Sequence, residues 1–279
     1  MSGHLFVIHG DLTRLACDAV LVPASAEPDI TAPWRSLFEP SRLSPRGDWF
    51  RVTMELPAEW PDPCRVARVP ERSGDRDVWL VRTDAWLREP TWVAEGLAEA
   101  VRTARRDLRG GARSVPLIGL ALAGTGAGGL HHERGAVVAA LVPALDRTAA
   151  ECGVDIALVL NDERDHVAVQ AVRDDPGRDV LDERQLVEAD RLGAAAADGH
   201  LVLFLGAGVS ISAGMPTWRG LIGELAVEAG ISPVDLDGFS ATDAAQIVHD
   251  VLGDDRFAES MRRRFTLKRH SAAHALLAG

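Results

Sequence analysis

Cysteine and long apolar runs are scarce in this sequence of 279 residues. Cys17, Cys64 and Cys152 stand far apart and form no CxxC pair. This spacing indicates neither a disulfide framework nor a zinc site, and sparse thiols are typical of a reducing cytosol. No apolar run approaches the ~18 residues of a membrane span, and the N-terminus does not have the pattern of a signal peptide. We therefore expect a cytoplasmic protein with no metal site and no membrane contact.

Positive charge is also scarce. Lys and Arg number 30 against 41 Asp and Glu, which gives a net charge of −11. A nucleic-acid or anionic-membrane partner would require clustered cations. The one basic cluster, Arg262 to Arg269, is interpreted as a solvated helix face. We expect no nucleic-acid partner, and the sequence leaves open whether the chain forms a homo-oligomer.

The hydrophobic pattern predicts an α/β fold. Hydrophobic residues make up 47% of the chain, enough for at least one sizeable core. Strands are expected at 4–10, 18–25, 48–56, 77–83, 114–122 and 154–160, and helices at 90–108, 132–151 and 164–173. Their order fits a three-layer α/β/α domain with a mixed sheet and helices on both faces.

A charged stretch separates this domain from the rest of the chain. Residues 174–190 are dominated by Asp, Glu and Arg, with Pro176 and Gly177. We expect a first domain at 1–173, a charged linker and helix at 174–197, and a second domain at 198–279. In the second domain the pattern predicts a strand at 201–205 and helices at 218–226, 242–252 and 255–264.

The second domain opens on a glycine loop that follows the apolar run at 201–205. Gly206, Ala207 and Gly208 have almost no side chains, so backbone N–H groups can converge on a diphosphate. A helix beginning near Pro216 would direct its positive end to the same place. The pattern indicates a nucleotide site or, as the alternative, a tight turn that binds nothing.

The longer string "GAGVSISAGMPTWRGL" resembles the opening motif of the SIR2 family. The resemblance implies a Rossmann-like domain whose cofactor is NAD. Gly206, Ala207, Gly208 and Ser210 would line the NAD pyrophosphate and ribose, and Pro216, Trp218 and Arg219 would lie on the cofactor-covering loop. Thr217 and Trp218 replace the Asp-Phe pair of protein deacetylases. This looks like the bacterial SIR2-like branch that cleaves NAD in anti-phage defence.

The catalytic Asn and His segments of the SIR2-like hydrolases have no counterpart before Gly279. We therefore expect this chain to hold the first part of a SIR2-like domain, with no catalytic residue of its own. NAD hydrolysis would belong to a longer chain.

The first domain contains two strings that resemble a macrodomain, "GDLTRLACDAVLVPAS" and "PLIGLALAGTGAGGL". The resemblance implies an ADP-ribose site. Asp11 would accept from the adenine amino group, and Leu12 would add a backbone contact. The loop around the diphosphate and distal ribose would comprise Gly124, Thr125, Gly126, Ala127, Gly128 and Gly129.

The segment "PASAEPDITAPW" replaces the Asn-rich segment with which ADP-ribosyl hydrolases of the macrodomain family position the distal ribose and water. This departure favours binding over hydrolysis. The resulting hypothesis is an anti-phage protein in which a macro-like domain senses an NAD-derived nucleotide and a SIR2-like domain binds NAD. The alternatives are a non-enzymatic nucleotide-binding or assembly module, and an ADP-ribosyl hydrolase.

Histidine pairs and tryptophans have simpler interpretations. His131 and His132 are expected at the surface of a helix start, and His270 and His274 give only weak support for a metal site. The tryptophans of the first domain are expected to pack in or around the core, although one could stack on an adenine.

Overall fold

The protein divides into two compact units, each with its own buried core. The first unit joins Met1–Thr13 to Cys17–Phe204, and the second joins Arg14–Ala16 to Leu205–Ala278. The structure, a computed structural model, describes residues 3–70, 73–74, 76–84, 88–108, 113–126, 128–173, 181–266 and 269–278.

A mixed sheet forms the centre of the first unit. Over the described residues it has six strands in the order β1-β9-β8-β2-β7-β6. Neighbouring strands are parallel except β6, which pairs antiparallel with β7 at one edge. The strands are β1 (Leu5–His9), β2 (Ala19–Ala24), β6 (Val66–Arg68), β7 (Asp77–Arg82), β8 (Leu117–Ala121) and β9 (Asp155–Leu160). The α/β class and the mixed sheet predicted from the sequence are confirmed.

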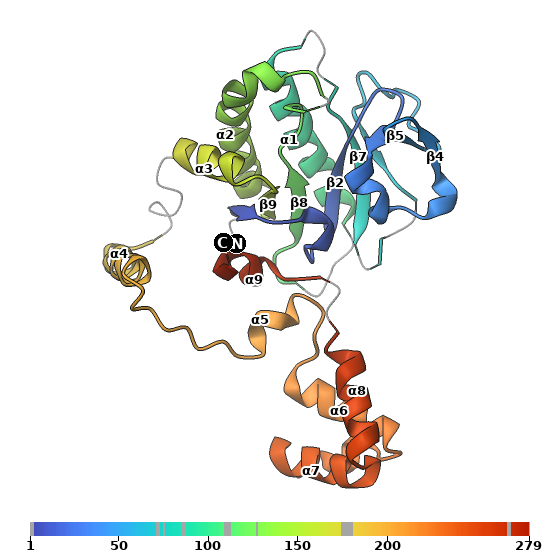
Figure 1. The fold of residues 1–279 in the computed structure, drawn as a ribbon, viewed down its shortest axis with the longest axis vertical. Helices are drawn as coiled ribbons and strands as arrows, with labels where there is room; N and C mark the ends of the chain where they lie inside the picture. The colour runs from blue at the N-terminus through green and yellow to red at the C-terminus, as the bar shows by residue number, and fades with distance from the viewer. Residues whose placement is uncertain are drawn as a thin grey trace. The chain divides into compact units, whose positions relative to one another are not determined.

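Three helices pack against this sheet and against one another (Figure 1). They are α1 (Pro90–Asp107), α2 (Arg134–Cys152) and α3 (Glu163–Val172). Helix α1 begins at Pro90, whose fixed φ suits a first helical turn, and buries Val93, Leu97 and Val101 along one stripe. The strands bury side chains on both faces, as Leu21 and its neighbour Val22 show. Both faces of the sheet are therefore covered, as the apolar strands predict.

A second, smaller sheet lies in the chain between β2 and β6. It is antiparallel, in the order β3-β5-β4, and comprises β3 (Asp29–Thr31), β4 (Leu43–Arg46) and β5 (Trp49–Val52). The strand expected at 48–56 thus ends at Val52. Asp29, Thr31, Trp49 and Arg51 lie on one face of this sheet, because alternate residues of a strand point the same way.

The remaining elements are short or lie outside the sheets. The last described helix of the first unit is α4 (Glu183–Ala197), which begins at a capping box formed by Asp182 and Gln185. The linker residues 174–180 lie outside the described residues. The 3-10 helices are η1 (Leu12–Arg14), η2 (Ala32–Leu37), η3 (Pro40–Arg42), η4 (His131–Glu133) and η6 (Pro233–Leu236).

Helices make up the second unit. They are α5 (Gly208–Ile211), α6 (Trp218–Glu228), α7 (Ala241–Leu252), α8 (Asp254–Arg264) and α9 (Ala272–Ala278). Leu221 and Leu225 of α6 pack with Val248 and Leu252 of α7 in a small core. The three longer helices match the expected ones closely. In the part of the chain that the structure describes, no helix is both long and apolar enough to cross a membrane.

The strand predicted at 201–205 is wrong. These residues form neither strand nor helix, and the side chains of Val202 and Phe204 are 73% and 96% exposed. A central parallel strand requires hydrogen-bonding neighbours on both sides. Over 181–266 and 269–278 no strand is present to pair with it, so its apolar composition alone does not make it a buried strand.

Candidate functional site

A cleft lies at the carboxyl-terminal edge of the main sheet, where the residues following three adjacent parallel strands meet. Ser25 follows β2, Thr83 and Asp84 follow β7, and Ala123 follows β8. The cleft encloses about 580 Å³, part of which is open solvent. Its lining is completed by Pro23, Ala24, Thr31, Trp34, Trp49, Leu122, Gly124, Gly126 and Gly128.

The sheet topology favours a ligand site at this position. Strand β8 leads to β9 on one side of the sheet, whereas β2 leads on to β6 and β7 on the other side. The chain therefore leaves two neighbouring strands in opposite directions. In open α/β sheets, ligands bind in the crevice that such a switch point creates.

The glycine loop after β8 forms one wall of the cleft. Gly124 has a φ of 83°, and its carbonyl oxygen accepts from the Leu130 N–H at 2.9 Å, which closes the loop. A Cβ on Gly128 would lie 2.6 Å from the Gly124 Cα, so packing of the loop on itself requires this glycine. A Cβ on Gly126 would meet nothing within 4 Å. Gly126 lines the cleft, and packing of the protein does not require a glycine there.

Four backbone N–H groups of this loop have no acceptor in the described protein. Among the described residues, those of Gly124, Thr125, Gly126 and Gly128 donate to no protein acceptor, whereas the Gly129 N–H donates to the Gly126 oxygen at 3.3 Å. Successive free N–H groups in a glycine-rich loop form a concave site for an anion. Of the predicted loop residues, Gly124, Gly126 and Gly128 line the cleft, Thr125 and Gly129 flank them, and Ala127 lies outside the described residues.

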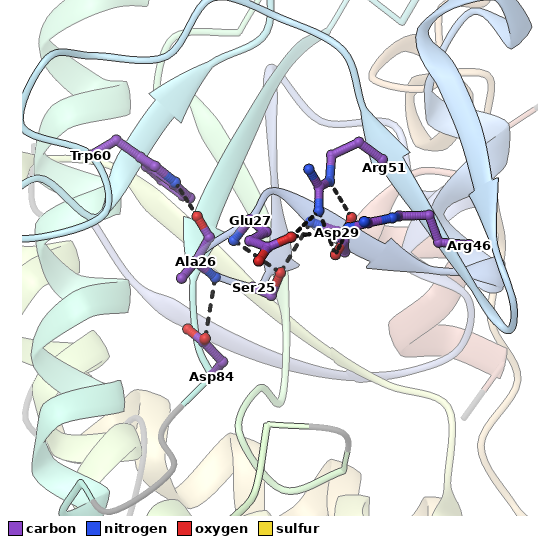
Figure 2. A network of polar contacts seen from close by, with 8 residues as sticks. All are labelled: Ser25, Ala26, Glu27, Asp29, Arg46, Arg51, Trp60 and Asp84. Atoms are coloured by element: carbon purple, nitrogen blue, oxygen red, sulfur yellow. Dashed lines mark hydrogen bonds and ion pairs between the residues drawn. The ribbon is translucent and has the colours of Figure 1, made fainter.

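The loop after β2 lines the same cleft as the glycine loop and is held by hydrogen bonds (Figure 2). The Ser25 Oγ accepts from the N–H groups of Glu27 and Asp29, both at 3.2 Å, and the Ser25 N–H donates to the Asp29 oxygen at 3.0 Å. Because its oxygen is engaged as an acceptor, the Ser25 hydroxyl keeps its own proton for donation. Ser25 lines the cleft, so it adds a donor to the free amides opposite.

Two contacts anchor Ala26 in the same loop. Its N–H donates to the Asp84 Oδ2 at 3.1 Å, and its carbonyl oxygen accepts from the Trp60 Nε1 at 2.8 Å (Figure 2). The other Asp84 oxygen accepts from the Arg82 Nε at 2.9 Å. Asp84, the one carboxylate in the described lining, is therefore engaged by both oxygens.

Ion pairs fix the start of the small sheet. Arg51 donates to both carboxylate oxygens of Asp29 and to Glu27, and the Arg46 Nη1 donates to the Glu27 Oε2 at 3.0 Å (Figure 2). Hydrogen bonds from Arg46 and Arg51 lower the pKa of Glu27 below its ordinary value. The cluster lies on the same face of the small sheet as Trp49, so it holds that face in register.

Two half-buried indoles form the wall of the cleft on this side. Trp34 comes from η2, and Trp49 lies opposite Thr31 across β3 and β5. Other tryptophans of the first unit have partners: the Trp60 Nε1 donates to a carbonyl, and three guanidinium groups stack near Trp92. Among the described residues, neither Trp34 nor Trp49 contacts another ring, a guanidinium or a hydrogen-bond acceptor.

Asp11 and Leu12 lie apart from the cleft lining. The Asp11 Oδ1 accepts from the Thr13 N–H at 2.8 Å and the Thr13 Oγ1 at 2.7 Å, so the carboxylate caps η1. Leu12 is buried, and its carbonyl oxygen accepts from the Arg76 Nη1 at 3.4 Å. Their predicted contacts with adenine stay predictions.

In the second unit, the loop at Gly206 is open. Gly206, Ala207 and Gly208 are exposed, and a Cβ on either glycine would meet nothing within 4 Å. Protein packing therefore does not explain these glycines. The N–H groups of Val209 and Ser210 are engaged by the carbonyls of Gly206 and Ala207.

Ser210 contacts a histidine from the far end of this unit. Its Oγ lies 3.3 Å from the His274 Nε2, while the His274 Nδ1 accepts from the Ser271 N–H at 3.1 Å. The Ser271 Oγ in turn donates to the Val209 carbonyl at 2.9 Å. These contacts tie α9 to the loop and orient the Ser210 hydroxyl.

The three residues expected on a cofactor-covering loop lie at the start of α6. Pro216 precedes Thr217, whose Oγ1 accepts from the Gly220 N–H and caps the helix. The Trp218 side chain is half exposed. Arg219 is exposed and lies 3.7 Å from Asp237. Their role toward NAD stays a prediction.

The histidine pairs form no metal cluster. The rings of His131 and His132 are 3.8 Å apart, and both residues are exposed, as expected. Both ring nitrogens of His274 face serines. Within the described ranges no group of three or more His, Cys, Asp and Glu side chains is placed to hold a metal ion.

The sequence reasoning missed Ser25, Thr83 and Asp84, and it did not single out Trp34 or Trp49 from the other tryptophans. A signal was present for the first three, because Ser25 and Thr83 follow directly on buried strands and Asp84 comes one residue later. A residue that follows a strand indicates a site only when the strands concerned, here β2 and β7, are known to be neighbours in the sheet. No local pattern distinguishes Trp34 and Trp49.

Comparison with known proteins finds remote similarity over about 60% of the chain. No family model and no curated protein matches the chain. The chain is similar to the Oceanobacillus iheyensis macrodomain with MES bound, at 16% identity and a TM-score of 0.39, over 60% of this chain and 88% of that one. The same macrodomain with ADP gives 17% identity and a TM-score of 0.37, over 60% and 87%.

Proposed function

We propose that the first unit binds a diphosphate-containing nucleotide of the ADP-ribose type. The observation that carries the proposal is the set of free amides at Gly124, Thr125, Gly126 and Gly128 beside an open cleft. The Ser25 hydroxyl across the cleft supplies a further donor. Several neutral donors around one cleft suit the oxygens of a diphosphate.

The composition of the lining also indicates that N–H and O–H dipoles, and not positively charged side chains, would bind the diphosphate. It contains no Lys, Arg or His among the described residues, and its carboxylate, Asp84, is held by Arg82 and Ala26. Lysine and arginine contacts make binding strongly dependent on salt. We therefore expect the affinity for a nucleotide diphosphate to change little between low and moderate ionic strength.

Binding is favoured over hydrolysis in this unit. The described lining offers no His, Cys or Lys as a base or nucleophile, and both oxygens of Asp84 are engaged as acceptors. An ADP-ribosyl hydrolase would need a group that activates water near the distal ribose. The proposed role is that of a sensor of an NAD-derived nucleotide.

Titration calorimetry of the whole chain with ADP-ribose, ADP and pyrophosphate tests this proposal. We expect heat from all three ligands. Gly126→Val should weaken binding without unfolding the unit, because the added side chain has open space. Gly193→Ala, also at an open position but on α4, is the matched control and should bind as the original chain does. Absence of heat with all three ligands would remove the proposal.

A second candidate is NAD binding at the Gly206 loop, as part of an anti-phage protein of the SIR2-like kind. One observation favours it: no described protein group fills the space at Gly206 and Gly208, and Ser210 is oriented by His274. We expect this chain to bind NAD without cleaving the nicotinamide–ribose bond. Two variants test this candidate. If Ser210→Ala binds NAD as tightly as the original chain and Gly126→Val removes all NAD binding, NAD binds to the first unit alone.

A further inference from the structure

We propose that Trp34 and Trp49 form the base-recognition site of the cleft. In this proposal, which rests on the diphosphate site proposed above, the aromatic base of a nucleoside diphosphate stacks on these two indoles, one from η2 and one from the small antiparallel sheet. Both indoles line the cleft together with the free glycine loop. A nucleotide whose diphosphate lies on that loop would place its base within the same cavity.

The state of the two indoles supports this role. Both are half buried, and among the described residues neither is used by another ring, a guanidinium or a hydrogen-bond acceptor. An aromatic side chain usually gains stability by stacking or by donating its N–H. Two indoles left without such partners in the wall of one cleft are available to a planar ligand.

The small sheet presents Trp49 rigidly. Trp49 pairs with Thr31 across β3 and β5 and with Arg46 across β4 and β5. Two residues along, on the same face, Asp29 pairs with Arg51 through two hydrogen bonds. The ion pairs thus fix the face that carries the indole. A site that is ordered before binding loses little conformational entropy when the ligand arrives.

The alternative position for the base is less favourable. The Asp11 carboxylate caps η1 through Thr13, and Asp11 does not line the cleft. A hydrogen bond from Asp11 would select adenine by its amino group, whereas stacking accepts any base because every base has a π-face. The two arrangements therefore differ in base selectivity as well as in location.

Calorimetry with pyrophosphate, ADP, GDP and UDP tests the proposal. We expect the three nucleotides to bind within about tenfold of one another and more tightly than pyrophosphate. Trp34→Ala and Trp49→Ala should each weaken ADP binding about 5- to 150-fold, the usual effect of losing one stacked aromatic, and leave pyrophosphate binding unchanged. Asp11→Ala should leave ADP binding within twofold.

Fluorescence provides a readout that does not depend on removing a ring. ADP should quench the tryptophan emission of the chain, and pyrophosphate should not. Trp34→Phe and Trp49→Phe keep an aromatic ring, so they can replace the alanine variants if those unfold. Each phenylalanine variant should remove part of the quenching. Trp92→Phe is the control: the residue lies on α1 outside the cleft lining, the phenyl ring stays beneath the Arg65 guanidinium, and the change should remove none of the quenching.

The outcomes separate the two proposals. If neither pyrophosphate nor any nucleotide binds, the diphosphate site and the base site both fail. If pyrophosphate binds as tightly as ADP, or if Asp11→Ala and not the tryptophan variants abolishes ADP binding, the base site fails and the diphosphate site stands. Strong selection of ADP over GDP and UDP would also overturn the base site.

Discussion

The Ala26 N–H donates to the Asp84 Oδ2 at 3.1 Å, a contact that joins two loops 58 residues apart in the sequence. The same carboxylate accepts from the Arg82 Nε. Asp84 therefore fixes the loop after β2 against the end of β7, and both loops line the cleft.

Replacing this carboxylate should loosen the cleft. In Asp84→Ala the half-buried Ala26 N–H and the Arg82 guanidinium each lose an acceptor, and we expect a loss of about 1–3 kcal/mol in the free energy of unfolding. Affinity for ADP-ribose should fall as well. Chemical denaturation and calorimetry measure the two effects. Asp48→Ala removes an exposed carboxylate in the turn between β4 and β5, and it should change neither quantity.

The two glycines at Gly126 and Gly128 should respond differently to the same substitution. In Gly128→Ala the new Cβ would lie 2.6 Å from the Gly124 Cα and 2.8 Å from the Thr83 oxygen, so the backbone must move. We expect a loss of about 1–3 kcal/mol, as for other overpacked sites, and a lower melting temperature. Gly126→Ala meets no neighbour and should melt as the original chain does. Equal melting temperatures for the two variants would contradict the loop geometry.

Two apolar runs show how far the sequence alone predicts the fold. Residues 156–160 and 201–205 are both five consecutive apolar residues, and both are expected to form strands. The first forms β9, because β1 and β8 lie on either side and satisfy its backbone. The second is exposed and has no described strand to pair with. The local hydrophobic pattern predicted the strand correctly at 156–160, where partner strands exist. At 201–205 the same pattern could not reveal that no described strand is there to pair with it.

The candidate site was predictable only where its residues are close in sequence. The glycine loop at 124–129 is a contiguous motif, so its composition identified it. Ser25, Asp84 and Trp49 come together only because β2 lies between β7 and β8 and because an inserted sheet follows β2. The sheet order follows from long-range pairing that no short window of sequence contains. The motif at Asp11 likewise did not reveal that Thr13 engages the carboxylate.

Glu228 should make the stability of the helical unit depend on acid pH. It accepts hydrogen bonds from the Ser260 hydroxyl and from Arg263 and Arg264, and these contacts lower its pKa from 4.5 to about 2. A group with a lowered folded pKa stabilises the fold above its unfolded pKa. Its contribution is therefore complete above about pH 4.5 and is lost as the pH falls toward about 2.

Denaturation of Glu228→Gln between pH 2 and 6 checks this linkage, because the variant cannot ionise at this position. Its unfolding midpoint should vary less across this range than that of the original chain. Glu259→Gln, on the exposed surface of α8, should keep the original pH dependence. If Glu228→Gln and the original chain lost stability in parallel, the Ser260 and arginine contacts would not be stabilising the charged form.

The contact between Ser210 and His274 predicts which ring nitrogen carries the proton. A backbone N–H can only donate, so the Ser271 N–H at 3.1 Å favours a lone pair on the His274 Nδ1, which also lies 2.9 Å from the Ser271 Oγ. The neutral ring then carries its proton on Nε2 and donates it to the Ser210 Oγ at 3.3 Å, which leaves the hydroxyl proton of Ser210 free for a ligand. Nitrogen-15 spectra of histidine-labelled protein, assigned with His274→Gln, should show the Nε2–H tautomer. Ser271→Ala keeps the backbone donor and should keep that tautomer. An Nδ1–H signal in the original chain or in Ser271→Ala would contradict the arrangement and would make Ser210 the donor to the histidine.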